Sequence, residues 1–447
     1  MSVKAAFIVP HPPLIIPEIG LGSEEKVRKT IEAYEKAAGQ IADIAPDTII
    51  ISSPHATMYY DYFHISPGEK AIGDFSMFNA PNVKFSEEYD FELVKEIEGL
   101  CAREDFPAGT DYERNPSLDH GTAVPLYFIR KAYKGGKIIR IGLSSLSYKA
   151  HLRLGEIIRE ATDNLGRKTV FVASGDLSHK LRDYGPYGFC EEGVEYDKKL
   201  MDVCSRATLK ELLDFDEKFC QKAAECGHRS FVIMAGALDG YSVKSEVYSH
   251  EDITGVGYGI CSFYPTGDAP EDEAEEESDD AYVRLAKKTI EAYINGEKEI
   301  ELPSDLPEEM LNRKAGTFVS IHKYGRLRGC IGTILPTAAC IGEEIIQNAV
   351  SAATKDPRFS PIKKSELSAL EISVDVLGEI EDIPSKDFLD VKRYGVIVTN
   401  GIRRGLLLPD LEGVDDVDCQ IEIAKGKAGI ESHEAVKLQR FEVIRHH

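Results

Sequence analysis

Three histidines in the first 180 residues each follow a short apolar run, and imidazole nitrogens can bind a transition metal or accept a proton near neutral pH. They are His11, His55 and His179, and the runs before them are VKAAFIV (3–9), TIIISS (48–53) and TVFVA (169–173). Runs rich in Val and Ile, separated by helical stretches, are typical of parallel strands buried on both faces. Ligands of such sheets bind outside the carboxyl ends of the strands. The sequence therefore predicts that the three imidazoles meet at one sheet edge and form a metal and proton-transfer site.

A third metal ligand is expected near residue 225. Glu225 lies in the segment AAECGHRS. Two histidines and one carboxylate form the ligand set that suits non-haem Fe(II), or another divalent metal, and leaves coordination positions open. The neighbouring Cys226 is the alternative third ligand, and its thiolate would favour a softer metal or a different role. His179 in SGDLSH is the expected general base, and His120 in LDHGTAVPL could hydrogen-bond bound substrate or oxygen.

The composition predicts a soluble protein without a nucleic-acid or membrane partner. The hydrophobic content is 43%, the charged content is 29% and the net charge is −23, whereas a nucleic-acid surface is normally basic. No apolar stretch is long enough to cross a bilayer, and the first apolar run breaks at Pro10 before it could act as a signal peptide. The nine cysteines include no CxxC pair, so we expect reduced thiols and a cytoplasmic location.

One acidic run divides the chain into two parts. The segment DAPEDEAEEESDD at 268–280 contains nine acidic residues among thirteen and no strongly apolar one. Such a run repels itself and cannot bury a core, so it predicts an acidic linker over 266–280. Since 447 residues are too many for one typical core, we expect one domain over 1–265 and a second over 281–447.

The two parts differ in the order of their expected elements. In the first part, strands are expected at 3–9, 48–53, 137–144, 169–173 and 255–264, and helices at 24–44, 88–101, 121–133, 149–164, 194–204 and 228–239. This alternation predicts an α/β class protein that begins with a three-layer α/β/α domain. In the second part, helices are expected at 281–295 and 340–354, and strands at 316–322, 327–333, 370–377 and 395–399. The less regular alternation there predicts a smaller α+β domain.

Five motifs of the first part resemble a known family. VPHPP, SPH, DHGTAVPL, SGDLSH and ECGHRSFVIMAGALDG occur in the order found in the LigB superfamily of class III extradiol ring-cleaving dioxygenases, which includes the Memo-like proteins. The resemblance spans 1–265. It implies a set of site residues, namely the metal ligands His11, His55 and Glu225, the catalytic base His179 and the substrate-contacting His120. In Memo-like members a cysteine stands near the third-ligand position, where Cys226 falls in this chain.

Two functions follow from this resemblance. The first is an Fe(II)-dependent extradiol dioxygenase, an enzyme that binds an aromatic diol such as a catechol through both oxygens and cleaves the ring beside the diol with O2. In that enzyme His179 accepts a proton of the substrate. The alternative is a Memo-like metal-binding accessory protein that holds its metal through Cys226 and works with a radical-SAM enzyme without cleaving rings.

The second part resembles the AMMECR family, whose activity is not settled. The best match is RLRGCIGT at 326–333, supported by DPRF and VDVLGEIEDI. Arg326 and Arg328 could bind an anion, and Cys330 could be a nucleophile or a small thiol packed in a strand. AMMECR, Memo-like and radical-SAM proteins are associated as a three-part system in prokaryotes, so the fusion implies a radical-SAM protein as a partner.

Overall fold

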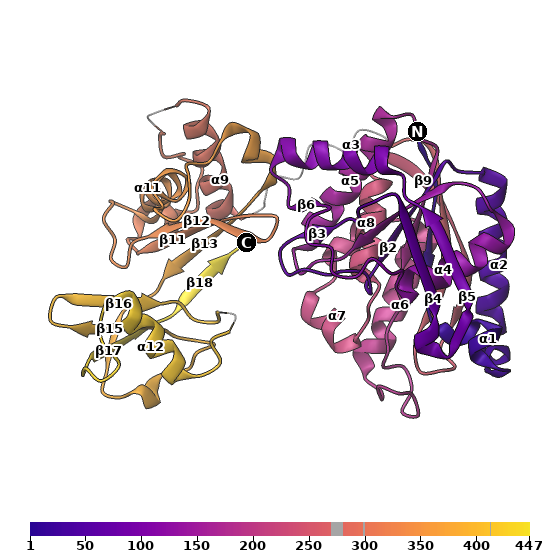
Figure 1. Cartoon of the computed structure of the whole chain (residues 1–447). Helices are drawn as coiled ribbons and strands as arrows, with labels where there is room; N and C mark the ends of the chain where they lie inside the picture. The colour runs from indigo at the N-terminus through magenta and orange to yellow at the C-terminus, as the bar shows by residue number, and fades with distance from the viewer. Residues whose placement is uncertain (270–279, 298–299, 412) are drawn as a thin grey trace. The chain divides into compact units, whose positions relative to one another are not determined.

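The computed structural model describes residues 1–269, 280–297, 300–411 and 413–447 (Figure 1). The chain forms two compact units, Met1–Asp272 and Glu273–His447. The predicted linker overlaps their ends, because one strand extends to Asp268 and Asp280 is the N-cap of the first helix of the second unit. The rest of the acidic run, at 270–279, lies outside the described residues.

A six-stranded sheet runs through the middle of the first unit (Figure 1). Its order is β7-β2-β8-β1-β10-β9. The strands are β1 (Val3–Val9), β2 (Thr48–Ser53), β7 (Lys137–Gly142), β8 (Thr169–Ser174), β9 (Tyr241–Glu251) and β10 (Tyr258–Asp268). The first four strands of that order are parallel, β10 is antiparallel to β1, and β9 is antiparallel to β10. The carboxyl ends of β2, β8 and β1 therefore lie side by side at one edge of the sheet.

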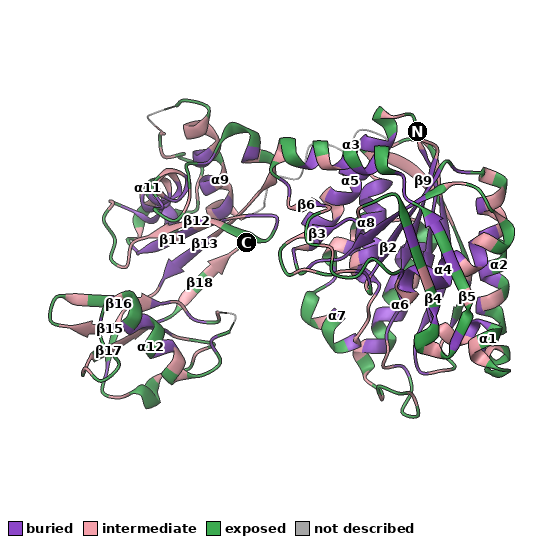
Figure 2. Ribbon diagram, in the orientation of Figure 1, coloured by how far each residue is buried: buried purple, intermediate pink, exposed green. Residues whose placement is uncertain are grey.

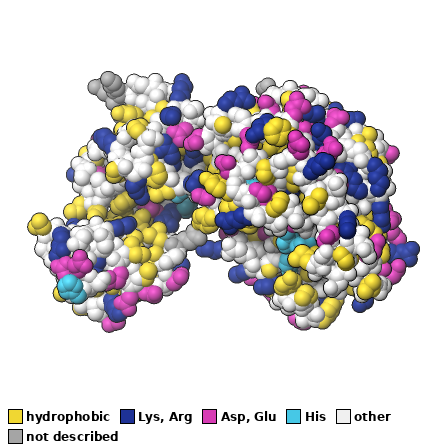
Figure 3. Space-filling view, in the orientation of Figure 1, with side chains coloured by type: hydrophobic (Ala, Val, Ile, Leu, Met, Phe, Trp, Pro, Cys, Tyr) yellow, Lys and Arg dark blue, Asp and Glu magenta, His cyan; other side chains and the backbone are white. Residues whose placement is uncertain are grey.

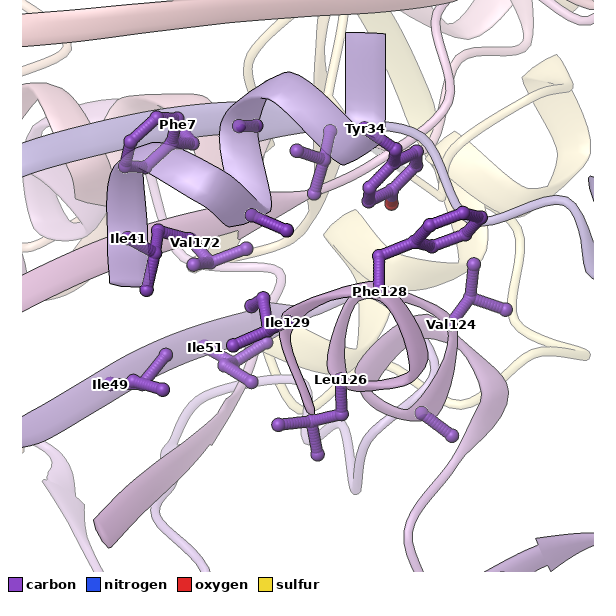
Figure 4. Packing of buried hydrophobic residues seen from close by; sticks show 14 of the residues in the cluster. Phe7, Tyr34, Ile41, Ile49, Ile51, Val124, Leu126, Phe128, Ile129 and Val172 are labelled. Carbon is purple, nitrogen blue, oxygen red and sulfur yellow. The ribbon is translucent and has the colours of Figure 1, made fainter. Parts of the chain in front are cut away.

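Helices cover both faces of this sheet. On one face α2 (Arg28–Ile44) packs against α4 (His120–Ala132), and on the other α5 (Tyr148–Asn164) packs against α8 (His228–Ala237). Successive residues of each strand point to opposite faces, so Phe7 packs with α2 and α4 whereas Ile8 is buried on the other side (Figure 4). The remaining α-helices are α1 (Pro17–Gly20), α3 (Phe91–Glu104), α6 (Glu191–Arg206) and α7 (Glu217–Ala223). This arrangement confirms the predicted α/β/α layers.

Removing one aromatic side chain from this core should destabilise the first unit. Phe7 is fully buried (0% exposed) in the middle of β1. Figure 2 shows that much of the central sheet is buried, whereas exposed residues gather on the outer sides of the surrounding helices. We expect Phe7→Ala to lower the free energy of unfolding by about 3–5 kcal/mol, because the cavity is only partly refilled. Equilibrium urea unfolding followed by far-UV circular dichroism measures this change. Phe91→Ala is the matched control, because Phe91 is 52% exposed and should change stability by less than about 0.5 kcal/mol. Equal losses in the two variants would contradict the packing seen here.

Two short pairs of strands lie outside the main sheet. The hairpin of β4 (Lys70–Phe75) and β5 (Ala80–Glu88) is antiparallel, and β3 (Phe63–His64) pairs with β6 (Ala108–Gly109) in parallel. The sequence did not predict these strands or β9. The hairpin buries few of its residues, so its strands lack the continuous apolar runs of the central sheet. The hairpin nevertheless forms one wall of the cleft described below.

The second unit contains two four-stranded antiparallel sheets, ordered β12-β11-β13-β18 and β14-β17-β15-β16. The strands are β11 (Thr317–Lys323), β12 (Arg326–Gly332), β13 (Leu370–Leu377), β14 (Glu381–Ile383), β15 (Gly395–Asn400), β16 (Arg403–Leu407), β17 (Lys437–Phe441) and β18 (Val443–His446). The helices are α9 (Ala281–Ile294), α10 (Glu308–Asn312), α11 (Ile341–Thr354) and α12 (Val417–Lys427). Helices α9 and α11 pack on the first sheet and α12 packs on the second. The predicted α+β class is confirmed, although β14, β16, β17, β18, α10 and α12 were not predicted.

Among the described residues of both units, we find no helix that combines the length and the apolar content needed to span a lipid bilayer.

Candidate metal centre

Two histidines and a cysteine converge at the carboxyl edge of the parallel strands. His11 lies just beyond β1 and His55 just beyond β2, and their Nε2 atoms are 3.0 Å apart. The Sγ atom of Cys226, in the loop before α8, is 3.7 Å from His11 Nε2. One ligand atom from each of the three residues lies within 4.8 Å of the others. These three side chains therefore form a compact set of potential metal donors.

A second set of donors shares Cys226. Asp176 and His179, both in the loop after β8, lie with Cys226 so that one ligand atom of each is within 4.8 Å of the others. In the part of the chain that the structure describes, these two sets are the only groups of three or more such residues with this spacing. All three predicted histidines are thus brought to one site, as the positions of their strands suggested.

The side chain of His11 is oriented by a serine at the end of β8. The Ser174 hydroxyl is 2.6 Å from the Gly121 carbonyl, to which it donates its single proton. The same oxygen is 3.0 Å from His11 Nδ1 and therefore accepts the proton of that nitrogen. This leaves the lone pair of His11 on Nε2, the atom that faces His55 and Cys226. His11 is accordingly in the tautomer that a metal ligand bound through Nε2 requires.

Ser174→Ala should weaken metal binding without changing the ligands themselves. We expect a loss of about 10- to 100-fold in affinity, because partners that fix the tautomer of a ligating histidine typically contribute this much. Competition with a chelator of known affinity measures the change. Ser52→Ala is the matched control, since the buried Ser52 hydroxyl lies at the end of β2 but bonds to Ser230 at 2.5 Å. If the two variants bound metal equally well, Ser174 would not act through His11.

Asp176 connects His11 and Cys226. Its Oδ1 accepts a hydrogen bond from the backbone N–H of His11 at 2.8 Å. Its own N–H donates to Cys226 Sγ at 3.2 Å, and its carbonyl accepts from Cys226 N at 3.4 Å and Gly227 N at 3.1 Å. Burial raises the pKa of this carboxyl group to about 6. One residue thus fixes the positions of two of the three donors.

A close approach of two glycines allows this connection. A Cβ atom on Gly175 would lie 2.1 Å from the Cα of Gly227, and one on Gly227 would lie 2.3 Å from the ring of Phe231. Neither position has room for a side chain. The missing side chains let the loop before α8 approach the end of β8, and this approach places Cys226 beside Asp176.

Glu225 occupies a different environment from its neighbour. Its Oε2 accepts a hydrogen bond from the backbone N–H of His228 at 2.6 Å, at the first residue of α8. Burial raises the pKa of Glu225 to about 7. Glu225 belongs to neither donor set found among the described residues. Adjacent residues project in different directions, so only one of the two predicted alternatives reaches the histidines, and in this structure it is Cys226.

Burial keeps the histidines of the site neutral. Burial, reinforced by the charge of His55, lowers the pKa of His11 to about 3. Burial, reinforced by His55 and His11, lowers the pKa of His120 to about 3 as well. Burial also lowers the pKa values of His55 and His179. Neutral imidazole is the form that binds a metal or accepts a proton. Burial raises the pKa of the Cys226 thiol well above its usual value, and coordination to a cation reverses that effect.

The two remaining predicted residues flank the donors. The ring of His120, the first residue of α4, is 4.0 Å from the ring of His55 and 5.4 Å from that of His11. His179 packs against Tyr187, with ring centroids 5.0 Å apart. Its Nε2 is buried and has no hydrogen-bond partner among the described residues. His179 therefore retains a nitrogen that can exchange a proton with a ligand.

A cleft of about 840 Å³ opens beside the histidines. His55 and His120 lie in its wall, which is completed by the β4–β5 hairpin and by part of the segment 115–119. Figure 3 shows histidine side chains at the surface of the first unit. The lining combines apolar groups such as Met77 and Phe85 with polar groups such as Asn115. This size and mixture suit a small organic molecule.

The three candidate residues of the second unit lie on one strand, β12, but in different environments. Arg328 is largely buried and bonds through Nε and Nη2 to the carboxylate of Glu366, at 3.0 Å each, and through Nη1 to the carbonyl of Ser360 at 2.8 Å. It therefore has a structural role in joining β12 to the segment after α11. Arg326 is exposed at the start of β12, and Cys330 is half-buried in the middle of the same strand.

Comparisons with known proteins agree with the two-part architecture. A family model described as the catalytic LigB subunit of aromatic ring-opening dioxygenase matches residues 5–261. The AMMECR1 family model matches residues 283–446. Protein CA_C1420 of Clostridium acetobutylicum is 41% identical over 466 residues, which cover 100% of this chain and 99% of that protein.

Two further relatives each match 37% of the chain. A protein of Thermotoga maritima is 50% identical over 167 residues, which are 37% of this chain and 96% of that protein. The crystal structure of the uncharacterized protein PH0010 from Pyrococcus horikoshii is similar at 36% identity, with a TM-score of 0.35, over 37% of this chain and 88% of that one. The two family models confirm the domain order that the motifs predicted. The chain belongs to the family of the catalytic LigB subunit of aromatic ring-opening dioxygenases and carries an AMMECR1 domain after it.

Proposed function

We propose that the first domain is a non-haem Fe(II)-dependent dioxygenase that opens the ring of a small aromatic diol. The observation that carries this proposal is the convergence of His11, His55 and Cys226 beside a cleft of about 840 Å³. Membership of a family of ring-opening dioxygenases supports the reaction type. The diol and O2 are the proposed substrates.

The donors suit a transition metal. Neutral imidazoles and a thiolate are ligands for transition metals, whereas Ca2+ and Mg2+ prefer oxygen ligands. We propose Cys226 as the third ligand in preference to Glu225, because its sulfur lies 3.7 Å from His11 Nε2. Three protein ligands leave coordination positions open for substrate and oxygen. Ferrous iron held here would supply the redox chemistry that activates O2 towards the diol.

The protein's own groups would bind the diol and move its proton. His179 is neutral and has a buried Nε2 without a partner among the described residues, so we propose that it accepts the proton of a diol hydroxyl. His120 lies in the wall of the cleft and would hydrogen-bond the bound molecule. Apolar side chains such as Met77 and Phe85 would pack on the aromatic ring and exclude water.

A second candidate function rests on the identity of the third donor. A thiol in place of a carboxylate departs from the two-histidine, one-carboxylate set of non-haem iron oxygenases. The position of Cys226 among the donors supports a metal-binding accessory protein as the alternative. In this alternative the protein would work with a radical-SAM protein, the partner that the fusion to an AMMECR1 domain implies, and would not cleave rings.

Anaerobic reconstitution with Fe(II), followed by a screen of catechol-type diols, tests both functions. We expect one iron per chain and, for at least one diol, stoichiometric consumption of O2 with the absorbance of a ring-opened product. Stoichiometric metal without O2 consumption for any diol would favour the accessory function. A purified chain that binds no divalent metal would contradict both.

A further inference from the structure

One arginine lies inside a buried strand of the central sheet. Arg140 is 1% exposed in β7, where its neighbours in sequence are isoleucines, and it lies beside Ile51 of β2. Burying a guanidinium costs free energy unless its donors are paired. A buried ion pair is weak evidence for a contribution to stability, whereas its fixed bonds favour a role in holding geometry.

The side chain of Arg140 bonds to three positions of the segment before α4. Its Nη1 donates to the carbonyl of Ser117 at 2.5 Å, and its Nη2 donates to the carbonyl of Asn115 at 2.9 Å and to the carboxylate of Glu113 at 3.2 Å. Its Nε donates to the hydroxyl of Ser66 at 2.6 Å. The guanidinium therefore joins the segment 113–119 to the edge strand β7.

The carboxylate of Glu113 depends on Arg140 for a positive charge. Its Oε1 accepts hydrogen bonds from the Thr57 hydroxyl at 3.1 Å and from the backbone N–H of Asn115 at 2.7 Å, and both donors are uncharged. Its Oε2 lies 3.8 Å from Nε2 of the buried His64. Burial lowers the pKa of His64, so this imidazole is neutral near pH 7. The ion pair with Arg140 is thus the charged contact that fixes Glu113.

The segment held by Arg140 forms part of the cleft wall and leads into α4. The segment contributes to the lining of the cleft through Asn115, Ser117, Leu118 and Asp119. Asp119 is the N-cap of α4, where its Oδ1 accepts from the Thr122 N–H at 3.0 Å, and its Oδ2 lies 3.8 Å from Arg140 Nη1. His120 follows as the first residue of α4. Arg140 therefore acts on both the wall and the start of the helix that carries His120.

We propose that Arg140 is a positioning residue of the cleft, which holds the segment 113–119 and the start of α4 so that the wall and His120 face a bound molecule in one arrangement. This inference rests on the proposed function for the identity of that molecule, a small aromatic diol. Arg140 does not touch the diol, because its side chain is buried and bonded within the protein. A lysine at 140 keeps the charge, but its single nitrogen cannot reproduce the bonds of the planar guanidinium.

Hydrogen–deuterium exchange of the full chain tests the position of the wall without any substrate. Two amides of the segment are hydrogen-bonded, that of Ser117 to Asn115 Oδ1 at 3.2 Å and that of Leu118 to the carbonyl of Ile72 at 2.8 Å. In Arg140→Lys we expect the peptide that covers 113–119 to exchange at least about tenfold faster than in the wild type, because loosening the segment opens these bonds. Peptides of α6 are the internal reference and should exchange at the wild-type rate.

A second variant keeps the test decisive if Arg140→Lys does not fold. Glu113→Gln removes the negative charge at the more exposed end of the ion pair and should also speed exchange at 113–119. The matched controls are Arg153→Lys and Glu156→Gln, which alter an ion pair on α5 whose residues do not line the cleft. Neither control should change exchange at 113–119. Wild-type exchange of this segment in both Arg140→Lys and Glu113→Gln would overturn the proposal.

Diol kinetics per bound iron show whether the position of the wall matters for substrate. We expect Arg140→Lys to raise KM about 10- to 100-fold with a much smaller change in kcat, because a displaced wall weakens contacts made before and during the reaction. A merely structural defect would lower the amount of active enzyme, and thus the apparent kcat, without raising KM. Faster exchange at 113–119 with an unchanged KM would overturn the role in substrate binding. If the wild type opens no diol ring, the proposed reaction fails, and the exchange result alone supports or overturns the role of Arg140.

Discussion

Replacing Cys226 by serine is expected to lower the affinity for Fe(II) at least about 100-fold, whereas replacing Glu225 by glutamine leaves it unchanged. The sulfur of Cys226 lies 3.7 Å from His11 Nε2, and a serine hydroxyl is a poor substitute for a thiolate ligand. Glutamine at 225 retains an oxygen that accepts the hydrogen bond from the His228 N–H at the start of α8. Iron content after anaerobic reconstitution, with chelator competition for the affinity, measures both effects.

The positive control for this comparison is His11→Ala, which removes a ligand that either arrangement requires and should abolish stoichiometric iron. The opposite pattern, in which Glu225→Gln loses iron and Cys226→Ser keeps it, would restore the carboxylate as the third ligand. That result would require the loop before α8 to adopt a different conformation when metal is bound.

His179→Ala is expected to lower the rate of ring opening by about 10²- to 10⁴-fold while iron remains bound. The reason is that His179 is neutral and its buried Nε2 is without a partner among the described residues, so its loss removes the proposed proton acceptor and none of the proposed ligands. Single-turnover absorbance measurements with an active diol give the rate, and iron analysis of the same samples shows whether the ligands are intact.

A matched control for His179→Ala is His322→Ala, which removes a histidine from the second unit and should leave ring opening unchanged. Full activity in His179→Ala would exclude the base role. Loss of iron together with activity would instead place His179 among the ligands, with Asp176 and Cys226 as its partners in the second donor set.

The sequence was sufficient to predict the sheet edge at which the candidate metal donors meet, because buried parallel strands are easy to recognise from their apolar residues. The run TIIISS at 48–53 is buried at every position because both faces of the sheet are covered, and His55 follows it after one proline. The choice between Glu225 and Cys226 was not predictable, because it depends on backbone hydrogen bonds from Asp176, which lies 50 residues away in the chain. The orienting hydroxyl of Ser174 was missed for a similar reason, since nothing near Ser174 in sequence indicates a contact with His11.

Exposed strands were harder to predict from the sequence than buried strands. Strand β5 alternates poorly between apolar and polar residues, and β9 has only two buried positions, so neither was predicted. In the second unit the basic residues of RLRG suggested anion binding, but Arg328 bonds to Glu366 instead.

The donors of the candidate metal centre are far apart in the chain. His11 and His55 are separated by 44 residues, and His11 and Cys226 by 215. An ion held by all three would join the ends of β1 and β2 to the loop before α8, so it would act on folding as a crosslink that only the native state can form. At a free metal concentration 100 times the dissociation constant, this would add about 2.7 kcal/mol to the stability of the first unit. No described residue of the second unit belongs to either donor set, so this unit should melt at the same temperature with or without metal. Its melting temperature is therefore an internal reference for metal binding to the first unit.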